Sequence, residues 1–294
     1  PFSTVLKEGN QLFEKNGSDF PFTAIDPKLP VSILFTSGTT GTSKGVMLSQ
    51  TNIIADIRGF LKVIPIRHGE TLLSVLPMHH TYENTCGFLA PLSHGMTVAF
   101  AENLKRIPDN LLEVQATILL GVPLLFESIY NKIMERIAEK GMTKFKIGRG
   151  IANLTEKLFH KNIRRKVFRP LHEKFGGKLW LLVSGGAAIS PEVSKGFREL
   201  GLLLLQGYGL TETAPVITLN LLNSFKDDSA GRPIPGSEFK IEEGEICVRG
   251  PMVMLGYYKN EEATKEVIRN GWFHTGDLGY FDEDSRKFSP NDDP

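Results

Sequence analysis

Short apolar runs alternate with helical patterns over most of the chain, and this alternation restricts the possible folds more than any other feature. The runs have the length of strands and lie at residues 31–35, 71–76, 96–100, 117–120, 179–183 and 202–205. Helical periodicity occurs between them, at residues 50–63, 122–139, 160–175 and 191–200. Alternating strands and helices favour a mainly parallel sheet covered by helices. We therefore predict an α/β fold of layered sheets and helices over residues 31–223.

The pattern changes near residue 224, after which helical segments become rare. Short alternating runs lie at residues 239–241 and 245–249, and one helical pattern follows at residues 261–269. Alternation with a period of two is typical of half-buried strands. We predict a small β-rich subdomain over residues 224–294.

The N-terminal segment, residues 1–30, differs from both parts. It combines a short amphipathic stretch at residues 5–13 with a proline-containing connector at residues 26–30. The chain also begins with Pro1 rather than methionine. We expect this segment to be a connector from an upstream part, and the chain to be a piece of a longer protein.

The overall composition narrows the class of protein. The net charge is +1 and 41% of the residues are hydrophobic, as in ordinary globular proteins. This balance gives no reason to expect a nucleic-acid partner. Cys86 and Cys247 lie far apart without metal-ligand spacing, so we expect buried free thiols in a reducing compartment. Because no apolar run reaches the length of a membrane span and no signal peptide is visible, we expect a cytoplasmic protein.

A loop rich in glycine and hydroxyl groups follows the first apolar run. Glycine accepts a positive φ without steric cost, so such a loop can direct several backbone N–H groups toward one point. Together with Thr and Ser hydroxyls and one ammonium group, these form a cradle for a polyanion. A flexible linker is the alternative, but it requires neither the lysine nor the threonines. The candidate phosphate-binding residues are Thr36, Ser37, Gly38, Thr39, Thr40, Gly41 and Lys44.

The flanks of this loop define its setting. The run at residues 31–35 before it is predicted to be a buried strand. After it, Ser49 is a suitable N-cap for a helix that begins near Gln50. The loop is not a Walker A motif, because Lys44 is followed by Gly45 instead of Ser or Thr.

Two adjacent histidines follow the apolar run at residues 71–76. His79 and His80 belong to the string LPMHHTYE. Neighbouring side chains of an extended chain point to opposite sides, so the two imidazoles would not easily share a metal ion. We therefore predict that they are structural or line a pocket.

Small residues follow the run at residues 179–183. Gly185, Gly186 and Ala187 would let a flat ring approach the backbone closely. Ser190 and Pro191 then have the pattern of an N-cap followed by a first-turn proline. An ordinary turn from strand to helix is the alternative.

The string QGYGLTET follows the run at residues 202–205. Its tyrosine offers an aromatic face for a base. Its first threonine offers a hydroxyl to a phosphate oxygen, and its glutamate offers a carboxylate suited to Mg²⁺. The candidate binding residues of this string are Gly207, Tyr208, Gly209, Thr211 and Glu212.

An aspartate beside a glycine ends the string GWFHTGD at residues 271–277. A carboxylate in such a position can accept the two vicinal hydroxyls of a ribose, as acidic residues do in other nucleotide sites. The alternative is a simple turn at Gly276 and Asp277 without a binding role.

These motifs resemble those of the adenylate-forming superfamily, which includes acyl-CoA synthetases, luciferases and peptide-synthetase adenylation domains. TSGTTGTSKG is similar to the family's phosphate loop, and QGYGLTET is similar to its adenylate-binding motif. Tyr82 and Glu83 after the histidines are most like long-chain fatty acyl-CoA synthetases. The likeness covers residues 30–284 in the family's order. It implies the large α/β N-terminal domain of these enzymes, with a small distorted β-barrel.

The resemblance also implies a reaction and its cofactors. A fatty acid carboxylate attacks the α-phosphorus of ATP to give acyl-AMP, and the thiol of CoA then displaces AMP, with Mg²⁺ as the metal ion. The implied catalytic residues are Lys44, His80, Thr211 and Glu212. The implied contacts are Lys44 with the phosphates, His80 with the carboxylate substrate, Gly185, Gly186 and Ala187 with adenine and the acyl end, Tyr208 with adenine, Thr211 with the α-phosphate, Glu212 with Mg²⁺ and Asp277 with the ribose.

The end of the chain departs from the family. After Asp284 the family continues into a hinge and a mobile C-terminal domain with a catalytic lysine, and the sequence here follows neither. We therefore expect that domain to be absent and this piece to lack the complete activity. Two alternatives are an acyl-AMP ligase that passes the acyl group to a carrier protein and a catalytically incomplete nucleotide-binding piece. An unrelated phosphate-loop NTPase would require an aspartate at the end of an apolar strand, and none of the predicted runs has one.

One segment is strongly basic. Residues 144–178 contain eleven Lys and Arg residues against only Glu156 and Glu173. A solvated helix face explains such a composition. A contact of the part from Lys157 to Lys178 with an anionic membrane surface, or with the phosphates of CoA, also explains it.

Overall fold

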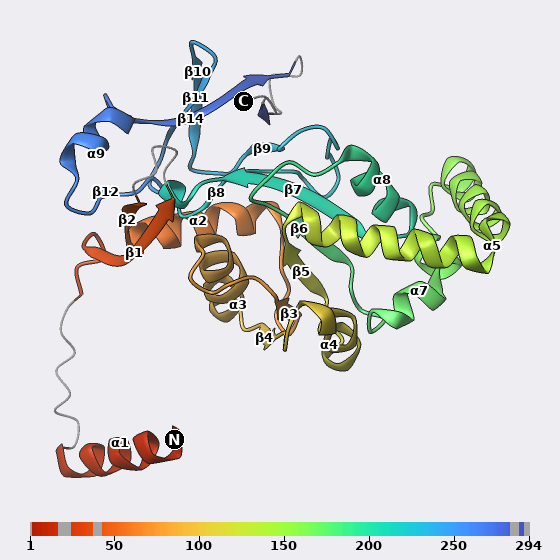
Figure 1. Cartoon of the computed structure of the whole chain (residues 1–294), viewed down its shortest axis with the longest axis horizontal. Helices are drawn as coiled ribbons and strands as arrows, with labels where there is room; N and C mark the ends of the chain where they lie inside the picture. The colour runs from red at the N-terminus through yellow and green to blue at the C-terminus, as the bar shows by residue number, and fades with distance from the viewer. Residues whose placement is uncertain (1, 17–24, 38–42, 283–287, 291–294) are drawn as a thin grey trace.

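The computed structural model describes residues 2–16, 25–37, 43–282 and 288–290 of the chain. Its helices are α1 (Phe2–Asn16), α2 (Gln50–Val63), the π-helix η1 (Tyr82–Leu89), α3 (Ala90–Ser93), η2 (Leu104–Arg106), α4 (Ile107–Val114), α5 (Pro123–Phe159), α6 (Arg164–Val167), α7 (Arg169–Lys174), α8 (Pro191–Glu199), η3 (Thr211–Thr213) and α9 (Glu261–Val267). Its strands are β1 (Pro30–Ser37), β2 (Ser43–Ser49), β3 (Thr71–Ser74), β4 (Thr97–Phe100), β5 (Ile118–Gly121), β6 (Leu181–Ser184), β7 (Leu203–Gly209), β8 (Val216–Leu219), β9 (Arg232–Pro233), β10 (Glu238–Glu242), β11 (Glu245–Arg249), β12 (Gly256–Tyr257), β13 (Ile268–Arg269), β14 (Trp272–Phe281) and β15 (Phe288–Pro290). Figure 1 shows α1 standing apart from the sheets.

A seven-stranded sheet forms the centre of the molecule, in the order β4-β3-β5-β6-β7-β8-β9. The first five strands are parallel, whereas β8 and β9 are antiparallel to their neighbours. Helices lie on this sheet (Figure 1). The predicted α/β fold with mainly parallel strands is therefore confirmed.

The strands of this sheet separate two hydrophobic clusters. Leu72 packs in one cluster and its neighbour Leu73 in the other, because successive side chains of a strand point to opposite faces. The first cluster includes Phe60 of α2, and the second includes Phe126 of α5 and Phe197 of α8. Both faces of the sheet are therefore covered, which explains why its strands are uninterrupted apolar runs.

Two smaller antiparallel sheets complete the fold. One has the order β1-β2-β12, and the other has the order β10-β11-β14-β13 with β15 paired to β14. The second sheet contains the predicted runs at residues 239–241 and 245–249, which confirms a small β-rich part. The division of the chain into domains at residues 30 and 223 stays a prediction.

The prediction that residues 31–35 form a buried strand is wrong in one respect. They form most of β1, but Val31, Ile33 and Phe35 are 55%, 41% and 68% exposed. The reason is that β1 pairs with β2 at the edge of a three-stranded sheet and does not enter the large one. An apolar run alone does not specify which sheet a strand joins.

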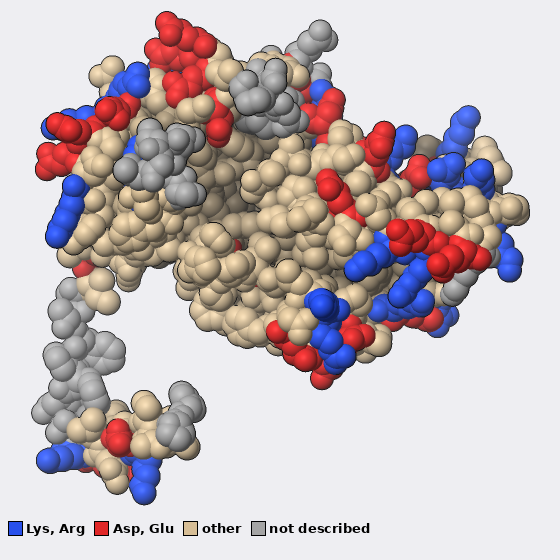
Figure 2. Space-filling model, in the orientation of Figure 1, with Lys and Arg blue, Asp and Glu red and all other residues tan. Residues whose placement is uncertain are grey.

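The helical region after β5 is longer and more broken than predicted. α5 extends to Phe159, and its backbone bends at Gly141, where φ is +105°. The pattern at residues 160–175 contains the two short helices α6 and α7. The second half of α5 forms one end of the molecule (Figure 1). Side chains of both charges lie beside an uncharged surface there (Figure 2).

The predicted start of α2 is confirmed and joins distant parts of the chain. The Ser49 side chain accepts a hydrogen bond from the backbone N–H of Asn52, and the Asn52 side chain accepts one from the backbone N–H of Ser49. Asn52 Nδ2 also donates to the carbonyl oxygens of Pro251 and Val253, each at 2.8 Å. This asparagine therefore fixes the segment that leads into β12.

Two further expectations concern the cysteines and the membrane. Cys86 and Cys247 are both buried and free, as predicted. Within the described residues, every helix is too short or too polar to cross a bilayer.

Candidate functional site

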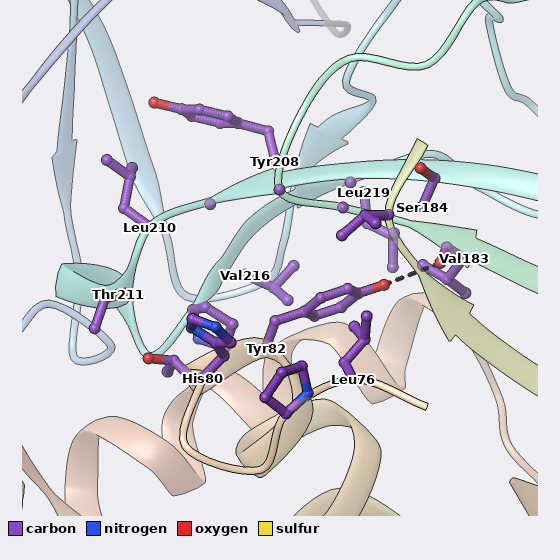
Figure 3. Close-up of a pocket in the computed structure, with 18 residues that line it drawn as sticks. Leu76, His80, Tyr82, Val183, Ser184, Tyr208, Leu210, Thr211, Val216 and Leu219 are labelled. Carbon is purple, nitrogen blue, oxygen red and sulfur yellow. Dashed lines mark hydrogen bonds between the residues drawn. The ribbon is translucent and has the colours of Figure 1, made fainter. Parts of the chain in front are cut away.

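A cavity of about 450 Å³ opens where three strands of the large sheet end (Figure 3). Its walls come from residues 76–82 after β3, residues 183–186 at the end of β6 and residues 207–211 at the end of β7. These are three of the segments that the sequence analysis selected. Ligands commonly bind beyond the carboxyl ends of the strands in open α/β sheets.

Tyr82 projects into the middle of this cavity (Figure 3). Its hydroxyl donates to the carbonyl oxygen of Val183 at 3.0 Å, which joins the first wall to the second. A side chain at Gly185 would begin only 3.2 Å from the Tyr82 ring, so the glycine lets this ring lie close to the backbone. Burial raises the pKa of Tyr82 well above its usual value, so this hydroxyl stays protonated. The sequence analysis did not include Tyr82 among the site residues.

The two histidines lie side by side, with ring centroids 4.4 Å apart. The expectation of opposite orientations is wrong, because residues 77–80 form a turn in which the His80 N–H donates to the Pro77 carbonyl oxygen. His80 lines the cavity described above. It also lines a second cavity of about 420 Å³ together with His79, Thr36 and Thr211. The structure therefore brings His80, Thr36 and Thr211 around one space.

The strands on either side of the candidate phosphate loop, β1 and β2, are antiparallel partners. Thr36 pairs with Lys44 and Ser37 pairs with Ser43, and the Ser43 hydroxyl donates to the Thr36 carbonyl oxygen at 3.2 Å. The predicted residues Gly38, Thr39, Thr40 and Gly41 lie outside the described residues.

Lys44 and Glu212 meet at a tyrosine. The Tyr257 hydroxyl donates to Glu212 Oε1 at 2.9 Å, and Lys44 Nζ lies 5.2 Å from the centre of the same ring. Tyr257 reaches this place because β12 pairs with β2. Burial and the nearby Glu212 carboxylate raise the pKa of Tyr257. Tyr257 was not among the residues predicted to belong to the site.

Asp277 and Tyr208 meet in the same way. The Tyr208 hydroxyl donates to Asp277 Oδ2 at 2.5 Å, which connects β14 of the small sheet to β7 of the large one. Figure 3 shows the Tyr208 ring on the opposite side of β7 from Tyr82. Burial and the Asp277 carboxylate raise the pKa of Tyr208, so the phenol remains the donor.

The turn between β7 and β8 is shaped by Gly209 and Thr213. A side chain at Gly209 would come within 1.9 Å of the Pro215 carbonyl oxygen, so this position requires glycine. The Thr213 hydroxyl bonds the carbonyl oxygens of Leu210 and Pro215 at 2.9 and 2.7 Å. These contacts hold Thr211 where it borders both cavities.

The predicted residues do not all line the cavity. Gly185, Gly186, Gly207, Tyr208, Gly209, Thr211 and His80 do. Among the remaining described candidates, Thr36 lines the second cavity, and those outside the lining of the first are Ser37, Ala187, Lys44, Glu212 and Asp277. The last three lie around it, held in place by contacts of the two tyrosines Tyr208 and Tyr257.

A group of possible metal ligands lies on the small sheet. Ligand atoms of Glu242, Cys247 and His274 lie within 4.8 Å of one another. His274 Nδ1 is 3.0 Å from Glu245 Oε2, and Glu242 pairs with Lys240. Burial raises the pKa of the Cys247 thiol, which favours the neutral form. Mutual hydrogen bonds and ion pairs account for this arrangement without a metal ion.

Comparison with known proteins shows to which family this chain belongs. The family model described as AMP-binding enzyme matches residues 3–258. The long-chain-fatty-acid–CoA ligase FadD15 of Mycobacterium bovis is 35% identical over 87% of this chain and 45% of its own length. The long-chain-fatty-acid–CoA ligase 6 of Mus musculus is 32% identical over 84% of this chain and 39% of its own length. The chain thus spans less than half the length of these relatives.

A solved structure supports the same fold. The o-succinylbenzoate coenzyme A synthetase of Bacillus subtilis in complex with AMP superposes with a TM-score of 0.70 at 23% identity. The superposition covers 90% of this chain and 50% of the synthetase. Because the family model matches most of the residues, the conclusion does not depend on this likeness alone. The chain belongs to the AMP-binding enzyme family.

Proposed function

We propose that this chain supplies the nucleotide- and acyl-binding part of a long-chain fatty acid–CoA ligase. The observation that carries the proposal is the convergence of three sequence motifs on one cavity, at residues 76–82, 183–186 and 207–211. The mycobacterial and mouse relatives are both named long-chain-fatty-acid–CoA ligases, which supports this substrate class. The complex of the Bacillus subtilis synthetase with AMP supports a nucleotide as the ligand.

In this proposal the adenylate lies at the ends of β6 and β7. Gly185 and Gly207 let a flat ring approach the backbone, and the Asp277 carboxylate accepts the ribose hydroxyls. The Tyr208 hydroxyl orients this carboxylate by donating to its Oδ2 atom. The Thr211 hydroxyl donates to the α-phosphate from the border of both cavities.

The reaction needs charge neutralisation more than it needs a protein nucleophile. An oxygen of the fatty acid carboxylate attacks the α-phosphorus of ATP, pyrophosphate leaves, and the CoA thiol later displaces AMP. His80 and Tyr82 form the wall where the carboxylate approaches, and Lys44 supplies positive charge at the phosphates. Positioned charges of this kind stabilise the charge that develops in the transition state.

The residues present also fit Mg²⁺. Glu212 offers a hard oxygen ligand, and its Oε1 already accepts a hydrogen bond that orients the carboxylate. Among the described residues, the grouped metal-ligand atoms lie elsewhere, around Cys247, so Glu212 would act as a single protein ligand. Mg²⁺ commonly binds through one or two carboxylates together with waters and substrate phosphates. When bound, it would neutralise phosphate charge beside Lys44.

Isothermal titration calorimetry with stable acyl-AMP analogues tests the proposal. We expect palmitoyl sulfamoyl adenosine to bind more tightly than acetyl sulfamoyl adenosine, because only the longer chain buries additional apolar surface. We also expect Asp277→Ala to weaken AMP and both analogues about tenfold or more, since a charged hydrogen-bond acceptor is lost.

Two variants separate the role of the carboxylate from effects on folding. Tyr208→Phe removes the same hydrogen bond but keeps Asp277, so it should weaken AMP less than Asp277→Ala does. Asp109→Ala removes an exposed carboxylate of α4 and should leave the affinity unchanged. Equal affinity for the palmitoyl and acetyl analogues would refute the long-chain substrate class. Unchanged AMP affinity in Asp277→Ala would refute the ribose assignment.

A further inference from the structure

The second half of α5, residues 142–159, is held against the body by one of its faces. The Phe145 ring packs on Phe168 at a centroid distance of 5.6 Å, and Ala152 is completely buried. A side chain at Gly148 would meet the Val167 side chain at 2.9 Å, so the helix approaches α6 closely there. This packing fixes which residues of the helix face outward.

The outward face carries a row of exposed apolar side chains. Ile147, Ile151, Leu154 and Leu158 are 58%, 52%, 58% and 59% exposed. Their spacing of four, three and four residues places them along one face of a helix, opposite Ala152. Single exposed apolar residues are common on proteins, but a row of this kind on one helix indicates a contact surface. We call these four residues the α5 stripe.

Positive charge borders the α5 stripe, and negative charge near it is neutralised. Lys144 and Lys157 lie on its two sides by helical spacing. Glu156 is the single acidic residue of residues 142–159, and its carboxylate is bound by Arg164 at 2.6 Å. The surface around the stripe is therefore both apolar and cationic.

Further positive charge lies in the basic segment around the α5 stripe. Glu173, the other acidic residue of the basic segment, is bound by Arg169 at 2.7 Å. Lysines for which the described residues provide no ion pair are Lys144, Lys146, Lys157, Lys161, Lys166, Lys174 and Lys178. Figure 2 shows Lys and Arg beside an uncharged surface at this end of the molecule, where Asp and Glu side chains also lie.

We propose that the α5 stripe inserts into the interface of an anionic lipid bilayer. Helices that lie in this interface combine an apolar face with flanking lysines, as the stripe does. A second copy of the chain is a less suitable occupant, because an identical stripe would bring its lysines against like charges. The inference is independent of the proposed ligand, since the second half of α5 lies far from the carboxyl end of β7 (Figure 1), where the cavity opens.

Vesicle sedimentation of the 294-residue chain tests the apolar part of the proposal. We expect binding to vesicles of equal parts phosphatidylserine and phosphatidylcholine, and about tenfold or more weaker binding by the double variant Ile151→Ser/Leu158→Ser. The control is Leu104→Ser/Leu112→Ser, which changes two leucines that are 67% and 52% exposed elsewhere on the surface. It should bind like the unchanged chain.

The charge part is tested with Lys144→Gln/Lys157→Gln. Each lysine near an anionic surface contributes about fivefold in affinity, so this variant should bind markedly less and the remaining binding should fall with added salt. Lys62→Gln/Lys105→Gln is the matched control. The proposal is overturned if the unchanged chain does not bind the mixed vesicles, if it binds pure phosphatidylcholine equally well, or if stripe and control variants lose binding alike. It is also overturned if the chain dimerises in sedimentation velocity and only the stripe variant becomes monomeric.

Discussion

Two tyrosine hydroxyls hold the two carboxylates to which we assign ligand contacts. The Tyr257 hydroxyl donates to Glu212 Oε1 at 2.9 Å, and the Tyr208 hydroxyl donates to Asp277 Oδ2 at 2.5 Å. In both pairs burial raises the pKa of the phenol, so each tyrosine remains a donor over the working pH range. One oxygen of each carboxylate is thereby fixed before a ligand arrives, which reduces the ordering that binding requires.

A buried carboxyl group in α2 makes stability depend on pH. Asp56 of α2 is fully buried, and burial raises its pKa well above 3.8, while the backbone N–H of Val216 opposes the shift. The folded chain therefore favours the protonated form, whereas the unfolded chain ionises at the usual pKa. This contribution to stability is complete below pH 3.8 and is lost as the pH rises through the folded pKa.

Asp56→Asn should remove this dependence, because the amide is neutral at every pH and nearly the same size. We expect the variant to have a higher free energy of unfolding than the unchanged chain at neutral pH, and the gain to disappear below pH 3.8. Urea unfolding at several pH values measures this difference in the free energy of unfolding. Asp109→Asn, at an exposed carboxylate, is the control. A gain that is the same at acidic and neutral pH would contradict the account.

At the scale of elements, α2 connects the hairpin β1–β2 to the segment before β12. Ser49 and Asn52 cap the helix reciprocally, and Asn52 also satisfies two carbonyl oxygens of the distant segment. The pairing of β12 with β2 then brings Tyr257 to Lys44 and Glu212. A single capping residue thus contributes both to helix stability and to the geometry of the candidate site.

Asn52→Ala should therefore destabilise the chain by roughly 1–3 kcal/mol, the range for leaving buried polar groups without partners. Asn223→Ala, at an exposed asparagine, should change the free energy of unfolding by less than about 0.5 kcal/mol. Thermal and urea unfolding measure both variants. If the two variants lost equal stability, the role assigned to Asn52 would be wrong.

Local pattern predicted the elements better than their pairing. The bounds of α2 and β11 were predicted from periodicity, and Ser49 was predicted as a cap from its residue type. The exposure of β1 was not, because it depends on which sheet the strand joins. The contacts of Tyr208 with Asp277 and of Tyr257 with Glu212 join residues far apart in sequence, so no local signal indicates them. The string around Tyr208 was predicted to belong to the site, but the hydrogen bonds of both tyrosines follow only from the fold.

At the scale of the molecule, the candidate site lies where three sheets meet. The large sheet supplies the cavity walls, the sheet β1-β2-β12 supplies Lys44 and Tyr257, and the small sheet supplies Asp277 from β14. The α5 stripe lies apart from all three (Figure 1). We therefore expect nucleotide binding to slow amide exchange in segments that are distant in sequence, but not at the stripe.

Hydrogen–deuterium exchange with and without AMP tests this central claim most directly. We predict that AMP slows exchange of the backbone amides in residues 205–212 and 272–279, because the ligand bridges β7 and β14. Exchange in residues 147–159 should not change, which provides an internal control. Protection of both predicted segments without an effect on the stripe agrees with the account. Unchanged exchange in residues 205–212 and 272–279 at saturating AMP would contradict it.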